Sequence, residues 1–167
     1  MKRNILHAPW RFKYIVSTLK KEKECIFCRM TLMKDEEAYI LYRGKHSFIV
    51  LNIYPYNTGH LMIAPYRHVP SIEDLSEEEL FEVMKLIQLS IKLLREVYNP
   101  HGFNIGVNMG RAAGAGVEEH VHVHVVPRWI GDINFLPSIC NVKVFSQAIK
   151  ESYEILKKKL QELMIVK

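Results

Sequence analysis

The sequence predicts one α+β domain, built from an antiparallel sheet, one long helix and a second helix near the C-terminus. Its 167 residues are 49% hydrophobic and 25% charged, as is typical of a single globular domain with its own core. Strand-like segments fall into two groups, on either side of one long helical segment. No internal repeat or low-complexity linker divides the chain, so we expect a single domain over residues 1–167.

The first group of strands precedes the long helix. Residues 38–43 and 46–52 are short β-prone segments, and Gly44-Lys45 between them predicts a hairpin. Residues 55–59 are predicted to form a turn, and residues 60–64 to return as another strand. Antiparallel neighbours are therefore expected before any long helix begins.

The long helix has clear sequence boundaries. Ser76 followed by Glu79 is a capping-box pattern, which predicts a helix start, and Asn99-Pro100 predicts its end. Apolar residues between these boundaries keep helical spacing, at positions 80, 84, 87, 91, 94 and 98.

The second group of strands follows this helix. We predict a strand over residues 103–108, a glycine-rich loop over 110–116, and a strand over about 120–126 that ends at Pro127. A second amphipathic helix is predicted over about 142–165. Its apolar face contains Phe145, Ala148, Ile149, Tyr153, Leu156, Leu160 and Leu163.

The charge distribution does not predict nucleic-acid binding. The net charge of +5 favours anionic partners in general, but much of the excess lies in residues 2–23 and 157–159, which solvated surfaces explain equally simply. No apolar run approaches the roughly 20 residues needed to span a bilayer, and the first 14 residues lack the apolar block of a signal peptide. We therefore expect a cytoplasmic protein without membrane association.

An alternating run of histidines and valines carries the strongest functional signal. In a strand, EEHVHVHVVPRW places His120, His122 and His124 on one face and the valines on the other. Same-face side chains lie roughly 6.6 Å apart, which suits a phosphate chain better than one small ion held by all three. The simpler alternative is a polar strand face that happens to be rich in histidine.

Histidine chemistry makes His122 the candidate nucleophile. A neutral imidazole nitrogen attacks phosphorus near pH 7 when its other nitrogen keeps a proton and donates it to an acceptor. His124 would donate a hydrogen bond to a phosphoryl or bridging oxygen. The preceding NMGRAAGAG segment brings glycine N–H groups that could cradle phosphate, although a merely flexible loop would have the same composition.

The histidine run and its surroundings resemble the histidine-triad (HIT) family of nucleotide hydrolases and transferases, and in particular its bacterial diadenosine tetraphosphate phosphorylase branch. The resemblance covers about residues 9–137. It rests on HVHVHVV, on residues 48–52 followed by Asn57-Thr-Gly-His60, on NMGRAAGAG, on HVVPRWIGDINF, and on Trp10-Arg11 and Tyr14. It implies a HIT-like sheet of about five strands per protomer, and a homodimer in which two sheets join into one of ten strands.

The resemblance also implies residue roles on a dinucleoside polyphosphate such as diadenosine tetraphosphate. His122 matches the nucleophile, oriented by a main-chain carbonyl, and His124 a phosphate contact. Asn52 matches the ribose position, and His60 a supporting position in the nucleotide site. The phosphate-binding segment matches Asn108, Gly110, Gly114, Ala115 and Gly116, and Trp129 matches the distal part of the pocket.

One departure from the family pattern affects phosphate binding. Many members carry Gln and then Ser or Thr directly before the triad, where this chain has Gly116 and Val117. Main-chain donors must then replace side-chain contacts, or the affinity for phosphate must differ.

Cys25 and Cys28 form a CxxC pair in the N-terminal extension over residues 1–37, whereas Cys140 stands alone and is expected in the core. In a reducing compartment such a pair favours a metal or redox site over a structural disulfide, and a metal-free thiol pair is the third alternative. Zinc-containing HIT members take two further ligands from positions that match His68 and His120. The resemblance therefore implies a structural zinc, with His120 a ligand in place of a catalytic acid.

Other functions remain open at this point. A mononuclear metallohydrolase or cupin-like site would need further ligands downstream, and none follows convincingly before Asp132. A nucleotide-binding regulator with little turnover and a HIT phosphoramidate hydrolase are alternatives within the family. Neither the acceptor, phosphate or water, nor the length of the phosphate chain follows from the sequence.

Some polar residues carry no functional prediction of their own. His7, His46 and His101 are expected at the surface or in caps, and Glu118 and Glu119 in solvent. Arg128 and Asp132 could pair with each other or touch substrate.

Overall fold

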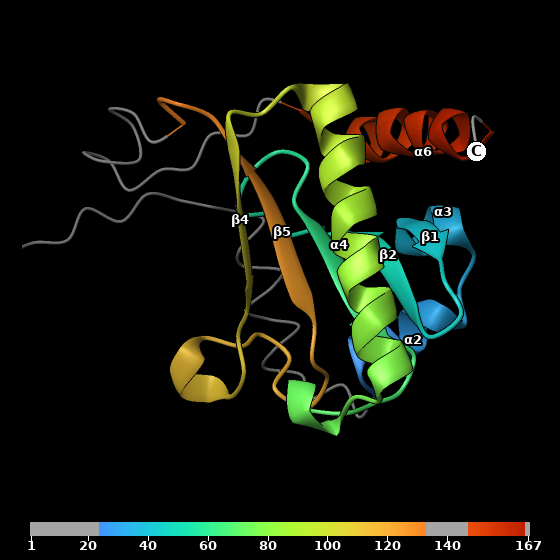
Figure 1. The fold of residues 1–167 in the computed structure, drawn as a ribbon, viewed down its shortest axis with the longest axis vertical. Helices are drawn as coiled ribbons and strands as arrows, with labels where there is room; N and C mark the ends of the chain where they lie inside the picture. The colour runs from blue at the N-terminus through green and yellow to red at the C-terminus, as the bar shows by residue number, and fades with distance from the viewer. Residues whose placement is uncertain (1–23, 133–146, 166–167) are drawn as a thin grey trace, which may run out of the picture.

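A five-stranded antiparallel sheet forms the centre of the protein, and helix α4 (Glu77–Tyr98) lies across one of its faces (Figure 1). The computed structural model describes residues 24–132 and 147–165. The strand order is β1-β2-β3-β5-β4, which confirms the α+β class. The strands are β1 (Ile40–Arg43), β2 (Ser47–Leu51), β3 (Leu61–Pro65), β4 (Gly102–Val107) and β5 (Val123–Arg128).

Helices cover both faces of this sheet. They are α2 (Ile26–Thr31), α3 (Asp35–Ala38), α4 (Glu77–Tyr98) and α6 (Ile149–Ile165), with the 3-10 turns η1 (Ile72–Asp74) and η2 (Arg111–Ala113). Within residues 24–132 and 147–165, no helix is long and apolar enough to cross a membrane.

The predicted capping box starts α4. The Ser76 side chain accepts from the Glu79 N–H at 3.3 Å, and the Glu79 carboxylate accepts from the Ser76 N–H at 2.7 Å. Arg67 also donates to this carboxylate and holds the pKa of Glu79 at about 2, well below its usual range. The helix ends at Tyr98, and the cap residue Asn99 has a left-handed φ of 43°.

The buried face of α4 is displaced from the apolar series that the sequence displays. Leu80 and Met84 belong to that series, yet they are 41% and 58% exposed. The face that packs on the sheet contains Val83, Leu86, Ile87, Ser90, Leu93 and Leu94.

Two core clusters lie on opposite faces of the sheet. On the α4 and α6 face, strand residues such as Ile63, Val123 and Val125 pack against both helices. On the other face, residues such as Val50 and Met62 pack with Phe27 of α2 and its neighbours. Strand alternation therefore assigns one face to α4 and the other to α2.

The strand that follows the histidines differs from its predicted boundaries. It begins at Val123, after His120 and His122, and it continues through Pro127 to Arg128. Proline fits here because its carbonyl oxygen faces Asn57, beyond the last pair of β5 with β3, Val125 with Leu61, so no ladder hydrogen bond is lost.

Several sequence predictions lie outside the described residues. These are Trp10, Arg11, Tyr14, His7, Cys140, Phe145 and the first residues of the predicted C-terminal helix. Within the described part, α6 starts at Ile149 and buries Tyr153, Leu156 and Leu160, as its apolar spacing predicted.

Candidate active site and metal site

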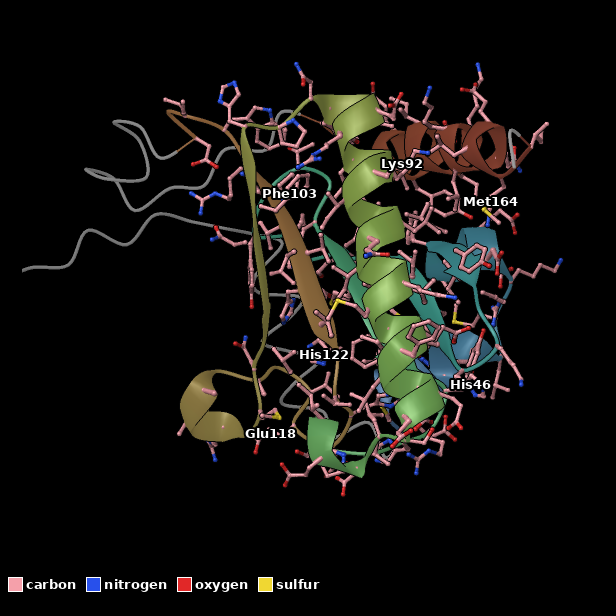
Figure 2. The ribbon with its side chains drawn as sticks, in the orientation of Figure 1. His46, Lys92, Phe103, Glu118, His122 and Met164 are labelled. Atoms are coloured by element: carbon pink, nitrogen blue, oxygen red, sulfur yellow. The ribbon has the colours of Figure 1, made fainter. Side chains whose placement is uncertain are left out.

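The three alternating histidines lie on the α2 face of the sheet. His120, His122 and His124 are 0%, 4% and 9% exposed, and Phe27 of α2 contacts the first two rings at centroid distances of 5.2 and 4.8 Å. Figure 2 shows His122 at the end of β5 nearer to Glu118, with Phe103 toward the opposite end of the sheet. The valine–histidine alternation thus places the valines in the core and the imidazoles in one row.

A main-chain carbonyl determines the protonation of His122. Its Nδ1 lies 2.9 Å from the His120 carbonyl oxygen, which can only accept, so Nδ1 carries the proton and donates it. Burial lowers the pKa of His122, which favours the neutral ring. Its Nε2 therefore keeps a lone pair, as a nucleophile requires.

A chain of two hydrogen bonds, which we call the relay to His124, determines the protonation of His124. The Tyr56 N–H donates to His60 Nδ1 at 2.9 Å, so the proton of the neutral His60 ring is on Nε2. That N–H donates to His124 Nδ1 at 3.0 Å, which leaves the His124 proton on Nε2. Burial, with His122 nearby, lowers the pKa of His124 to about 4.

The carbonyl contact of His122 and the relay to His124 give the two neighbouring rings opposite functions. His122 presents a nitrogen lone pair and His124 an N–H donor, and their ring centroids are 4.8 Å apart. A nucleophile beside a hydrogen-bond donor is an arrangement suited to attack on phosphorus.

His120 belongs to a different cluster, formed with Cys25, Cys28 and His68. Their candidate ligand atoms all lie within 4.8 Å of one another. Nδ1 of His120 is 3.3 Å from Cys25 Sγ and 3.6 Å from Cys28 Sγ, and Nδ1 of His68 is 3.4 Å from Cys28 Sγ. Ligands of tetrahedral zinc are about 3.5 Å apart, given bonds of about 2.0–2.3 Å. The donor set and its spacing therefore fit a metal of this kind.

The second nitrogen of His120 supports the same conclusion. Nε2 is 2.9 Å from the Pro65 carbonyl oxygen and so must donate, which leaves the Nδ1 lone pair directed at the two thiols. Burial lowers the pKa of His120 and raises that of Cys28. The side chain of His120 thus faces the cluster with Cys25, Cys28 and His68, while its carbonyl orients His122.

The glycine-rich loop lies at the same end of the sheet as His122. Gly110 and Gly114 have φ values of 73° and 83°, which residues with a side chain rarely adopt. Ala115 N–H returns to the Gly110 carbonyl at 3.3 Å, so the loop folds on itself and leaves Gly116 exposed. Asn108 directly follows the pair Val107–Val123 and is therefore next in register to His122.

Two further predicted residues have their side chains engaged elsewhere. Asn52 Oδ1 accepts from the Tyr54 N–H, and its Nδ2 lies 3.2 Å from His60 Nδ1, so its side chain lies beside His60. Trp129, in contrast, follows the far end of β5, and its indole N–H donates to the Tyr98 carbonyl at the end of α4. The described contacts do not bring Trp129 to the histidine pair.

The sequence analysis expected a main-chain carbonyl beside His122, and that of His120 lies there, but it missed two other main-chain groups. The amide of Tyr56 and the carbonyl of Pro65 fix histidine protonation, and the sequence gives no signal for such contacts beyond the Asn57–His60 turn. Arg128 and Asp132 pair with each other, one of the two alternatives left open. Glu118 and Glu119 are exposed, as expected.

Comparisons with known proteins agree with this geometry. A family model for the HIT domain matches residues 34–129. A Mycobacterium tuberculosis protein named AP-4-A phosphorylase is 41% identical over 158 residues, which cover 90% of this chain and 81% of that protein. A Dictyostelium discoideum bis(5'-adenosyl)-triphosphatase is 31% identical, over 76% of this chain and 84% of its own length.

A solved structure is also similar. It is a zinc-bound histidine triad family protein from Mycobacterium smegmatis, with a TM-score of 0.70 and 26% identity. The match covers 87% of this chain and 99% of that chain.

Proposed function

Because the chain belongs to the HIT domain family, we propose that it is an enzyme that cleaves dinucleoside polyphosphates through a covalent nucleotidyl intermediate on His122. Relatives named for activity on such compounds, a phosphorylase and a triphosphatase, support the substrate class. The observation that carries the proposal is the hydrogen bond from His122 Nδ1 to the His120 carbonyl, because it leaves Nε2 as the nucleophile.

The reaction has two steps, and each step forms one bond to the α-phosphorus and breaks another. Nε2 of His122 attacks the α-phosphorus, the bond to the bridging oxygen breaks, and the remaining nucleotide leaves with the electron pair. The Nε2–H of His124 stabilises the negative oxygen by hydrogen bonding. Phosphate or water then attacks the same phosphorus, and the phosphorus–nitrogen bond breaks to restore His122.

The surrounding residues bind the rest of the nucleotide in this proposal. Asn108 and those main-chain N–H groups of residues 110–116 that do not close the turn of the loop contact phosphate oxygens, consistent with the exposed residues of that loop. Asn52 binds the ribose next to His60. Trp129, at the other end of β5, is left for the distal part of a long substrate.

We also propose a structural zinc ion held by Cys25, Cys28, His68 and His120. The metal would fasten α2 to the segment that precedes β5 and would give His120 a structural function. A reducing compartment such as the cytoplasm would keep both cysteines as thiols.

The proposed assembly is a homodimer through β4. Among the described residues, β4 pairs only with β5, so one of its edges is left for a second copy. Ile105 of β4 is 45% exposed, and the exposed α4 residues Leu80 and Met84 add apolar surface on the helix.

Product analysis tests the reaction and identifies the acceptor. With diadenosine tetraphosphate, attack at the α-phosphorus releases ATP, and the AMP on His122 leaves as AMP with water or as ADP with phosphate. ATP in both conditions, with ADP only when phosphate is supplied, would identify a phosphorylase. A symmetric split into two ADP molecules without phosphate would contradict attack at the α-phosphorus.

A further inference from the structure

A polar cluster at the C-terminal end of β5 is not part of the site described above. It consists of Arg128, Asp132 and Asn57, and we call it the β5 clasp. Asp132 Oδ2 accepts from Arg128 Nε at 2.6 Å, from Asn57 Nδ2 at 3.0 Å and from the Trp129 N–H at 3.2 Å. Oδ1 accepts from Arg128 Nη2 at 2.8 Å.

The clasp is more than a surface ion pair. The Asp132 side chain is only 11% exposed and accepts four hydrogen bonds, and Arg128 holds the pKa of this carboxyl at about 2. Asn57 Nδ2 also donates to the Pro127 carbonyl at 3.1 Å. The end of β5 is thereby tied to the turn between β2 and β3.

That turn carries the first group of the relay to His124. Asn57 follows Tyr56, whose N–H donates to His60 Nδ1, and the Asn57 carbonyl accepts from the His60 N–H at 3.1 Å. Gly59 holds the turn close to α4, since a Cβ at this position would lie 2.8 Å from the Tyr98 ring. The position of Asn57 thus determines whether the Tyr56 amide reaches His60.

We propose that Asp132 is a positioning residue for the proposed reaction, because it holds Asn57, keeps Tyr56 N–H on His60, and so keeps the His124 proton on Nε2. The proposal rests on the proposed function of His124 as the donor to the leaving phosphate. If the turn shifts, His60 Nδ1 is left with the longer hydrogen bond from Asn52 Nδ2, at 3.2 Å, so the His60 ring can exchange its proton between its two nitrogens. His124 then presents a lone pair to a phosphate oxygen. Lone pairs on both atoms repel each other, so transition-state stabilisation is lost.

Two variants separate this function from a general loss of structure. Asp132→Ala removes the whole carboxylate. Asn57→Ala removes the donor to Asp132 and Pro127 and the acceptor of the Thr58 N–H, but leaves the Arg128–Asp132 pair in place. Glu96→Gln is the matched control, because it disrupts an exposed ion pair with Lys159. The rate of nucleotidyl-protein formation from diadenosine tetraphosphate is measured in each full-length variant.

We expect the rate to fall about 10- to 100-fold in Asp132→Ala and in Asn57→Ala, and to remain unchanged in Glu96→Gln. The double variant should lose no more than the slower single variant, because both changes break one link. Full wild-type rates in both single variants, or a double loss equal to the product of the two single losses, would overturn the proposal.

Histidine protonation gives a readout that a purely structural residue would not alter. A long-range ¹H–¹⁵N spectrum of the folded wild type should show the His124 proton on Nε2, and each clasp variant should show both tautomers. An unchanged Nε2–H signal in both variants would contradict the clasp. This spectrum applies even if the wild type forms no adduct, a result that would contradict the proposed function instead.

Discussion

Replacing His60 tests the relay to His124 at its central residue. His60 is 0% exposed, accepts from the Tyr56 N–H at 2.9 Å and faces His124 Nδ1 at 3.0 Å. In His60→Leu the Tyr56 N–H, Asn52 Nδ2 and His124 Nδ1 all lose this partner, and each buried polar group left unsatisfied costs about 1–3 kcal/mol. His124 is buried, so the loss of its partner carries a full share of this cost. We therefore expect the free energy of unfolding to fall by about 2–4 kcal/mol.

Activity should fall as well, because the His124 proton is no longer confined to Nε2. A lost proton donor typically costs about 10²–10⁴ in rate; because the His124 ring itself remains, we expect the lower end of that range. His60→Gln is the matched control, since its amide offers one acceptor and one donor. Urea unfolding and the single-turnover rate are measured for both variants. A His60→Leu protein with wild-type stability and rate, or a His60→Gln protein as impaired as His60→Leu, would refute the relay.

Three further predictions concern the fold, the metal and the assembly. Glu79→Gln should destabilise the fold by about 1–2 kcal/mol at pH 7. Because the folded pKa of about 2 lies below the ordinary 4.5, this loss of stability should persist above pH 4.5 and vanish as the pH falls toward 2. Urea unfolding measures the difference, and an equal difference at every pH would argue against this prediction. Cys28→Ser should abolish the one zinc per chain expected by elemental analysis and lower the melting temperature, whereas retained zinc would exclude the proposed ligand set. Ile105→Asp should give monomers in light scattering. The control Ile130→Asp should stay dimeric, because Ile130 lies in the loop after β5 and is 88% exposed. Dimers in both variants would count against the β4 interface.

Local patterns in the sequence were sufficient for much of this fold. The capping box at Ser76 and the histidine–valine alternation depend only on nearby residues, and the structure confirms both. The CxxC pair could be matched to His68 and His120 only through the family resemblance, because nothing local connects residues 40 and 92 positions apart, and the structure brings the four together.

Features that depend on distant elements could not be predicted. Pro127 remains inside β5 because β3 begins only at Leu61, opposite Val125, a fact about another strand. Leu80 is exposed because the sheet packs against the side of α4 that carries Val83 and Leu86. The main-chain donors and acceptors that fix the histidine protons have no side-chain signature.

Capture of the covalent intermediate tests the nucleophile most directly. Radiolabelled diadenosine tetraphosphate is mixed with the wild type and with His122→Ala, and the reaction is stopped in alkaline denaturant, which preserves a phosphorus–nitrogen bond. We predict one labelled peptide, with AMP on His122, and no label in His122→Ala. Label that persists in His122→Ala, or wild-type turnover without any labelled peptide, would contradict the assignment of His122 as the nucleophile.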